Sequence, residues 1–183
     1  MSGSVIWFTG LSGAGKSTLA EAFATELRRT GKRVTVIDGD AIRQSRKRPL
    51  GFSREHILQN GRDIIEACQQ EAAQHDFVLV AVITPFAQTR HDARAAIEPN
   101  YFEVYVATSV EICAKRDAKG LYAKASRGEL LNLVGVSESI PYERPRDSDL
   151  VVDTASVSVE EARDRVRLAV RAWQAKLSIR RER

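Results

Sequence analysis

The chain has little of what marks several classes of protein. Its 183 residues include two cysteines, Cys68 and Cys113, which are too few for a disulfide scaffold and lead us to expect a reduced, cytoplasmic protein. No apolar run approaches the roughly 20 residues that a membrane-spanning helix needs. The first four residues carry no basic side chain, so we expect no cleaved signal peptide. Internal repeats and low-complexity tracts are also missing, which excludes fibrous and disordered proteins.

The remaining composition is that of a globular domain with a mild positive charge. Hydrophobic residues make up 43% and charged residues 28%, close to globular averages, and the formal net charge is +4. Much of the excess lies between Arg43 and Arg48 and between Arg163 and Arg183. No RNA-binding aromatic motif or zinc-ligand spacing accompanies these stretches. We therefore interpret the second stretch as the solvated face of a last helix, and expect no nucleic-acid or membrane partner.

Apolar strand patterns alternate with helical patterns along the chain. We predict strands at residues 5–8, 33–37, 77–83, 101–107 and 150–152, and helices at 17–29, 53–74, 89–97, 109–117 and 157–177. Strands that are apolar throughout and separated by helices indicate an α/β fold with a parallel sheet covered on both faces. Residues 119–146 break this rhythm, because they are polar, basic and rich in turn residues. We therefore expect a single domain over residues 1–183, with residues 119–146 forming a lid over the active site.

The segment Gly10-Leu11-Ser12-Gly13-Ala14-Gly15-Lys16-Ser17 matches the phosphate-binding pattern G-x-x-x-x-G-K-[ST]. It follows a predicted strand and opens a predicted helix, which is the context that this P-loop motif requires. Its glycines let backbone N–H groups turn toward phosphate oxygens, and the helix N-terminus adds positive potential. We predict that Lys16 binds the β- and γ-phosphates of a nucleoside triphosphate and that the hydroxyl of Ser17 binds Mg2+.

The P-loop indicates the nucleotide class but not the reaction. GTPases usually carry an N/T-K-x-D motif for the base, which this sequence lacks, and motor ATPases need a larger domain. A short domain with a basic lid favours a kinase that closes over a small acceptor and excludes water. The fold expected for such an enzyme is the three-layer P-loop NTPase fold of the nucleotide kinases.

Asp38-Gly39-Asp40 follows the second predicted strand. The carboxyl ends of parallel strands meet at the ligand crevice, so Asp38 and Asp40 are candidates to hold Mg2+ and to orient the acceptor hydroxyl. An ordinary polar turn is the alternative, since Asp-Gly is common in turns. The P-loop favours the catalytic interpretation.

Other candidates lie around the same crevice, and several have two interpretations. Arg43 and Arg62 would either hold an anionic acceptor or lie on the surface. Phe52 would either stack on a base or act as a hydrophobic staple at a helix start. Thr84 and Pro85 follow the third predicted strand and should face the crevice.

The chain resembles the adenylylsulfate (APS) kinase family from about Val5 to Thr154. The segments that carry the resemblance are residues 7–18, Asp38-Gly39-Asp40-x-Ile42-Arg43, Leu50-Gly51-Phe52-Ser53-Arg54-Glu55, Asn60-x-Arg62, residues 113–125, Pro141-Tyr142-Glu143 and Asp153-Thr154. The Asp-Gly-Asp and Lys-Gly-Leu-Tyr segments are more specific than the P-loop. In that family, ATP phosphorylates the ribose 3′-hydroxyl of APS to give 3′-phosphoadenylylsulfate (PAPS).

The resemblance implies a role for each matching residue. The implied ATP-binding set is Gly10, Ser12, Gly13, Ala14, Gly15, Lys16, Ser17, Thr18, Arg116 and Thr154, of which the last two lie near the base. The implied catalytic set is Lys16, Asp38 and Asp40, and the metal set is Ser17 and Asp38. The implied acceptor-binding set is Asp40, Arg43, Phe52, Arg62, Thr84, Pro85 and, from the lid, Lys119, Leu121 and Tyr122.

The departures from the family pattern all lie on the acceptor side. Ala41 stands where the family usually has Asn, and Ala87 stands where it usually has an Arg that would supply a cation near the acceptor. Leu133-Val134-Gly135 replaces Phe-Thr-Gly, whose Phe sandwiches the adenine of APS. Base–aromatic stacking contributes about 1–3 kcal/mol, so this loss should weaken APS binding. The ATP side is intact, which is the pattern expected when the donor is kept and the acceptor has changed.

The sequence thus favours an APS kinase that uses ATP and Mg2+ and binds small nucleotides. The alternative is a related kinase for another nucleotide-linked anion, such as a cytidine diphosphate derivative of the phosphoramidate type. A non-catalytic nucleotide-binding module is a third interpretation, which the intact Lys16, Ser17, Asp38 and Asp40 oppose. The apolar helix faces permit a homodimer without requiring one.

Overall fold

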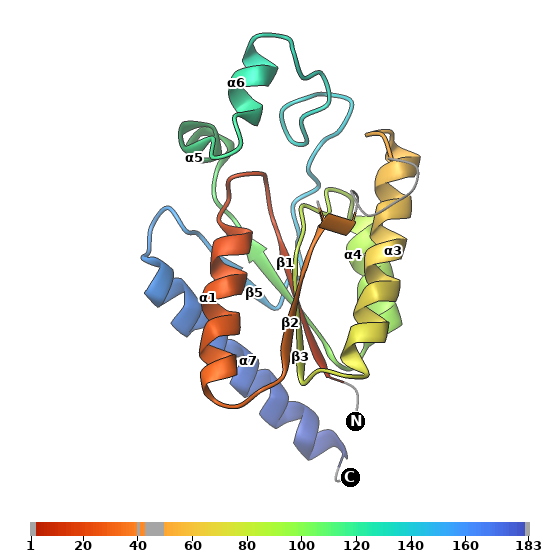
Figure 1. Cartoon of the computed structure of the whole chain (residues 1–183), viewed down its shortest axis with the longest axis vertical. Helices are drawn as coiled ribbons and strands as arrows, with labels where there is room; N and C mark the ends of the chain where they lie inside the picture. Colours follow the sequence, from red (N-terminus) through yellow and green to blue (C-terminus); the bar gives the residue numbers. More distant parts are fainter. Residues whose placement is uncertain (1–2, 40, 43–49, 182–183) are drawn as a thin grey trace.

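The computed structural model describes residues 3–39, 41–42 and 50–181, which form a parallel sheet between helices (Figure 1). The strands are β1 (Ser4–Thr9), β2 (Val34–Asp38), β3 (Phe77–Ala81), β4 (Tyr101–Val106) and β5 (Leu150–Val152), in the order β2-β3-β1-β4-β5. The helices are α1 (Lys16–Arg29), α3 (Arg54–Ala72), α4 (Ala87–Ile97), α5 (Val110–Arg116), α6 (Leu121–Ser126) and α7 (Val159–Arg181). Every strand pair is parallel, so the predicted α/β fold with a parallel sheet is confirmed.

The central strand β1 shows why the sheet is covered on both faces. Ile6 and Phe8 belong to one core, which includes residues of α1 and α7, whereas Val5 and Trp7 belong to a second core with residues of α3 and α4. Successive side chains of a strand point to opposite faces, so an entirely apolar strand needs a helical layer on each side. Figure 1 shows α1 and α7 on one side of the sheet and α3 and α4 on the other.

Helix starts follow the capping residues. The Oγ atoms of Ser53 and Ser109 accept hydrogen bonds from the N–H groups of the third residues of α3 and α5, His56 and Ile112, as expected for helices that start there. The last helix begins at Val159 rather than at 157, because Ser158 and Glu161 form a capping box in which each side chain accepts from the other residue's N–H. It also runs on to Arg181, beyond the predicted end at 177.

The lid contains more structure than its polar composition indicates. Helix α6, which the sequence did not predict, begins where Asp117 accepts hydrogen bonds from the N–H groups of Tyr122 and Ala123, both 3.0 Å away. Further along the lid, Val134 and Ile140 are buried in a small core of their own with two residues at the starts of α3 and α4. The lid is therefore packed onto the domain through apolar contacts.

The two cysteines and the C-terminal charges have structural roles. Cys68 and Cys113 are buried free thiols, and burial raises the pKa of Cys68 to about 12.

Arg163 and Arg167 of α7 form ion pairs with Glu26 of α1 at 3.0 and 3.1 Å. The sequence predicts that the basic face of the last helix is solvated, but part of it is packed against α1. None of the described helices is long and apolar enough to cross a membrane.

Candidate active site

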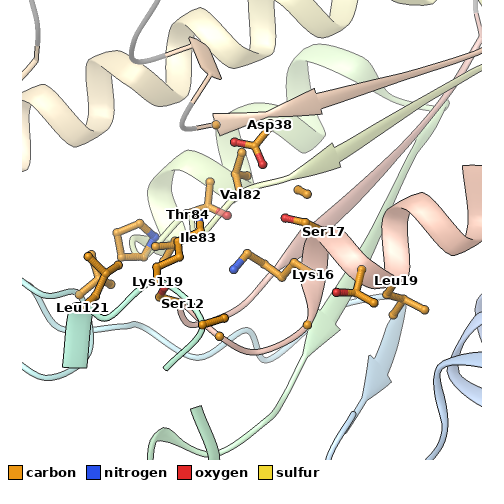
Figure 2. A pocket seen from close by; sticks show the side chains of 18 of the residues that line it. Ser12, Lys16, Ser17, Leu19, Asp38, Val82, Ile83, Thr84, Lys119 and Leu121 are labelled. Atoms are coloured by element: carbon orange, nitrogen blue, oxygen red, sulfur yellow. The ribbon is translucent and has the colours of Figure 1, made fainter. Parts of the chain in front are cut away.

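The P-loop, residues 10–17, connects β1 to α1 at the carboxyl edge of the sheet. Gly13 and Gly15 have φ values of 76° and 99°, which residues with a side chain rarely adopt. A Cβ atom at Gly15 would also lie 3.1 Å from Oγ1 of Thr154, a tight contact that adds to the strain of a side chain at this position. Lys16 is 8% exposed and projects from this loop into a cavity (Figure 2).

The cavity has a volume of about 650 Å3 and brings most of the predicted residues together. Those that line it are Ser12, Gly13, Gly15, Lys16, Ser17, Thr18, Asp38, Phe52, Thr84, Pro85, Arg116, Lys119, Leu121 and Thr154. Gly10 and Ala14 belong to the P-loop but do not line the cavity. The predicted donor and acceptor sides therefore share one space.

Ser17 and Asp38 form the candidate metal site. Figure 2 shows both side chains beside the cavity, Ser17 at the start of α1 and Asp38 at the end of β2. Gly39 lets this turn lie against the end of β3, because a Cβ atom there would lie 2.6 Å from Cγ1 of Val82. A hydroxyl and a carboxylate suit Mg2+, which usually completes its coordination with substrate phosphates and water. Asp40, the second predicted carboxylate, lies outside the described residues.

Hydrogen bonds join Arg116 and Thr154, the two residues that the resemblance places near the base of ATP. Arg116 donates from Nη1 to Oγ1 of Thr154 and from Nη2 to its carbonyl oxygen, both over 2.8 Å. Oγ1 of Thr154 in turn donates to the carbonyl oxygen of Ala14, 2.8 Å away. These bonds fix the planar guanidinium beside the P-loop, where it lines the cavity and can stack on a nucleobase.

Phe52 is predicted to stack on the base of the acceptor. Its ring precedes α3, is 44% exposed and lines the cavity. Such exposure suits base stacking better than a hydrophobic staple, which would be packed against the helix. Thr84 and Pro85 follow β3, and Lys119 and Leu121 reach the same cavity from the lid (Figure 2).

Besides Asp40, three residues predicted to bind the acceptor are not described as lining the cavity. Tyr122 is 9% exposed and donates to the carbonyl oxygen of Ser12 over 2.8 Å, so it supports the P-loop from behind. Arg62 is exposed on α3 and donates to Oε1 of Gln59. Arg43 lies outside the described residues.

Sequence reasoning missed much of the acceptor wall. The missed residues are apolar side chains of α3 and of the segment after β3, namely Ile57, Ile64, Val82 and Ile83, whereas Leu133 and Val134 of the lid, which also line the wall, had been noted as departures from the family pattern. Asn60 and Thr89 line it too, and Oδ1 of Asn60 and Oγ1 of Thr89 are buried with no hydrogen-bond partner in the described structure. The Asn60-x-Arg62 segment was a usable signal for Asn60, whereas no motif marked Thr89. Uncharged polar atoms among apolar side chains suit a nucleobase better than a densely charged sugar acid.

Known proteins resemble this chain over most of its length. The family model of adenylylsulphate kinase matches residues 2–153. An adenylyl-sulfate kinase of Paraburkholderia xenovorans is 42% identical over 164 residues, which cover 90% of each chain. An adenylyl-sulfate kinase of Chloroflexus aurantiacus is 43% identical over 169 residues, covering 92% of this chain and 89% of its own.

Solved structures agree with these relatives. The APS kinase CysC of Mycobacterium tuberculosis, in complex with AMPPNP and APS, has a TM-score of 0.87 at 35% identity, covering 93% of this chain and 98% of that one. A gluconokinase from Sinorhizobium meliloti shares the fold alone, with a TM-score of 0.67 at 19% identity. With the P-loop, Asp38 and the lid gathered at one cavity, the chain belongs to the adenylylsulphate kinase family.

Proposed function

We propose that this chain is an ATP-dependent kinase that phosphorylates the ribose 3′-hydroxyl of APS to give PAPS, a step of sulfate assimilation. The observation that carries the proposal is that Lys16, Ser17 and Asp38 share one cavity with Phe52. Arg116, which would bind the base of ATP, and Phe52, which would stack on the base of the acceptor, line the same cavity. The relatives named adenylyl-sulfate kinase and the structure bound to AMPPNP and APS support the same pairing of substrates.

The residues assign a mechanism of in-line phosphoryl transfer. Lys16 would neutralise charge on the β- and γ-phosphates, and Ser17 and Asp38 would hold Mg2+, which supplies further charge neutralisation when bound. A carboxylate at the end of β2 would orient the acceptor hydroxyl. The lid would exclude water, because its residues Leu133 and Val134 are buried and line the cavity.

A second candidate is a kinase for another nucleotide-linked anion, such as a cytidine diphosphate derivative. One feature of the acceptor side favours it, namely fewer cations than the family pattern has. In the described part of the lid, Lys119 supplies a cation to the cavity, but Ala87 occupies the position where the family usually has Arg. A non-catalytic module remains the third interpretation. We further propose a cytoplasmic enzyme that binds small nucleotides and no nucleic acid.

A coupled assay of ADP release with ATP and Mg2+ tests these proposals by comparing APS with cytidine diphosphate derivatives. Fast turnover of APS at micromolar concentration is the expected result, and an Asp38→Asn variant should lower its kcat by about a hundredfold or more. A strong signal from a cytidine derivative with little from APS would replace the first candidate by the second. The absence of turnover with every acceptor would favour the non-catalytic module.

A further inference from the structure

The corner that follows β3, residues 83–85, has an unusual backbone. Thr84 lies on the cavity wall (Figure 2) with a φ of 42°, in the left-handed region that β-branched residues rarely adopt. Such a conformation persists only where the surrounding contacts enforce it, and it is found mostly at functional sites. The contacts of this corner come from three separate parts of the chain, namely β1, α4 and the end of the lid.

A chain of hydroxyl groups holds the side of the corner that faces β1. Each hydroxyl has one proton to donate, which fixes the direction of every bond. Oγ1 of Thr9 donates to the carbonyl oxygen of Ile83 over 2.7 Å. The hydroxyl of Thr84 donates to Oγ1 of Thr9 over 2.9 Å and accepts from the indole N–H of Trp7 over 3.2 Å. The hydroxyl of Tyr142, 2.9 Å from Oγ1 of Thr9, is therefore the donor in their bond.

Arg90 holds the other side of the corner. It is 5% exposed, and its guanidinium donates to the carbonyl oxygens of Thr84 and Glu143, each over 2.7 Å. The N–H of Glu143 donates to the carbonyl oxygen of Pro85 over 2.8 Å. Tyr142 and Glu143 are adjacent residues at the end of the lid. Their hydrogen bonds therefore attach this end of the lid to both sides of the corner.

We propose that Arg90 and Tyr142 are positioning residues, which hold the Thr84 corner in its left-handed conformation and lock the end of the lid to it. Neither side chain lines the cavity, so neither acts by touching a substrate. The inference rests on the proposed function in one respect: the substrate that contacts the corner is taken to be the phosphoryl acceptor. Loss of these contacts separates the Thr84 corner from the end of the lid, so binding of the acceptor weakens more than binding of ATP.

Steady-state kinetics of a Tyr142→Phe variant test the lock, by which we mean the contacts of Arg90 and Tyr142 that join the Thr84 corner to the end of the lid. The substitution removes one hydroxyl and leaves the ring in place against Tyr105, 6.1 Å away between ring centres. Loss of one hydrogen bond predicts a rise of about three- to tenfold in the KM for APS, with the KM for ATP and the melting temperature unchanged. Tyr105→Phe is the matched control, because the Tyr105 hydroxyl makes no hydrogen bond in the part of the chain that the structure describes.

Arg90→Lys is a second variant, because a lysine cannot reach both carbonyl oxygens with the geometry of a guanidinium. It should shift the KM for APS in the same direction and further than Tyr142→Phe. Equal rises in the KM for APS and for ATP in both variants would overturn the proposal, since they would indicate a general structural defect.

Binding without turnover gives an independent measurement. Trp7 donates to Thr84, whereas the second tryptophan, Trp173, lies in α7. In a Trp173→Phe background, APS titrated without ATP should change the fluorescence of Trp7, and Tyr142→Phe should raise the midpoint by the same factor as the KM. An unshifted midpoint would contradict the lock.

Limited proteolysis separates a failure of this inference from a failure of the proposed function, because it needs no substrate. Tyr142→Phe should speed tryptic cleavage at Lys124 and Arg127 in the lid relative to Tyr105→Phe, at equal melting temperature. If the wild-type protein did not use APS but Tyr142→Phe sped the cleavage of the lid, the lock would stand and the assignment of APS as the acceptor would fall. An unchanged cleavage rate would overturn the lock whatever the acceptor is.

Discussion

The Nζ atom of Lys16 lies 2.8 Å from the carbonyl oxygen of Leu11, within the loop that both residues belong to. This bond keeps the ammonium group inside the cavity, where phosphates are expected to bind. Lys16→Ala should therefore lower kcat/KM by about a hundred- to a thousandfold without unfolding the protein. Kinetics together with a thermal melt check this, and Lys32→Ala, at an exposed position after α1, is the control. Near-normal turnover would contradict the assigned role.

Asp38→Asn should lower kcat by about a hundredfold or more, because the amide keeps the shape of the side chain but loses its charge. If Asp38 binds the metal, the Mg2+ concentration that gives half-maximal rate should also rise. A titration of Mg2+ at saturating ATP measures this. Asp92→Asn, at an exposed position of α4, should change neither quantity. An unaltered Mg2+ dependence in Asp38→Asn would limit its role to the acceptor hydroxyl.

Arg116→Met should raise the KM for ATP by about tenfold, since the stacked, hydrogen-bonded guanidinium is lost while the length of the side chain is retained. The KM for APS should stay within about twofold. The exposed neighbour Lys115→Met provides the control for charge on α5. A change in the KM for APS alone would contradict the assignment of Arg116 to the ATP-binding side of the cavity.

Leu133→Phe should improve APS binding by restoring an aromatic face opposite Phe52. The stacking energy of about 1–3 kcal/mol corresponds to a decrease in KM of at least about fivefold. Leu133 is 4% exposed and lines the cavity, whereas Leu131, in the same loop, is 76% exposed and does not line it. Leu131→Phe is therefore the control. Isothermal titration with APS measures the effect, and an unchanged affinity would mean that the lost ring does not limit binding.

Helix α6 should lose protection at acid pH. The N–H groups of Ala123 and Tyr122 donate to the carboxylate of Asp117 and hold its pKa below the ordinary value of 3.8. A group with a depressed folded pKa stabilises the fold above its unfolded pKa, and this contribution disappears as pH falls through the folded value. Amide exchange in Leu121–Ser126, corrected for intrinsic rates, should therefore rise below about pH 4. Asp117→Asn should remove this pH dependence.

The donor side could be predicted from the sequence because its chemistry is local. The P-loop is one continuous segment whose glycines, lysine and serine have fixed places, and Asp38 follows an apolar strand that must end at the crevice. The acceptor wall could not be predicted in the same way. Thr89 and Gly61 lie on different helices, and their contact depends on how α3 and α4 pack, since a Cβ at Gly61 would collide with Thr89.

The lid shows a second limit of sequence reasoning. Leu121 and Tyr122 are adjacent in one motif, yet Leu121 lines the cavity while the hydroxyl of Tyr122 supports Ser12 from behind. Helix α6 turns consecutive side chains about 100° apart, so only one of the two can face the substrate. Since the sequence did not predict this helix, it offered no means of separating their roles.

The strand order also separates two groups of site residues. The P-loop, Arg116 and Thr154 follow β1, β4 and β5, whereas Asp38 ends β2 and Thr84 follows β3. A chimaera that takes residues 34–97 from a kinase of different specificity, with Asp38 kept, should replace much of the acceptor wall and retain the P-loop, Arg116 and Thr154. The order of the strands thus predicts that the choice of acceptor depends on one contiguous stretch of chain together with the lid.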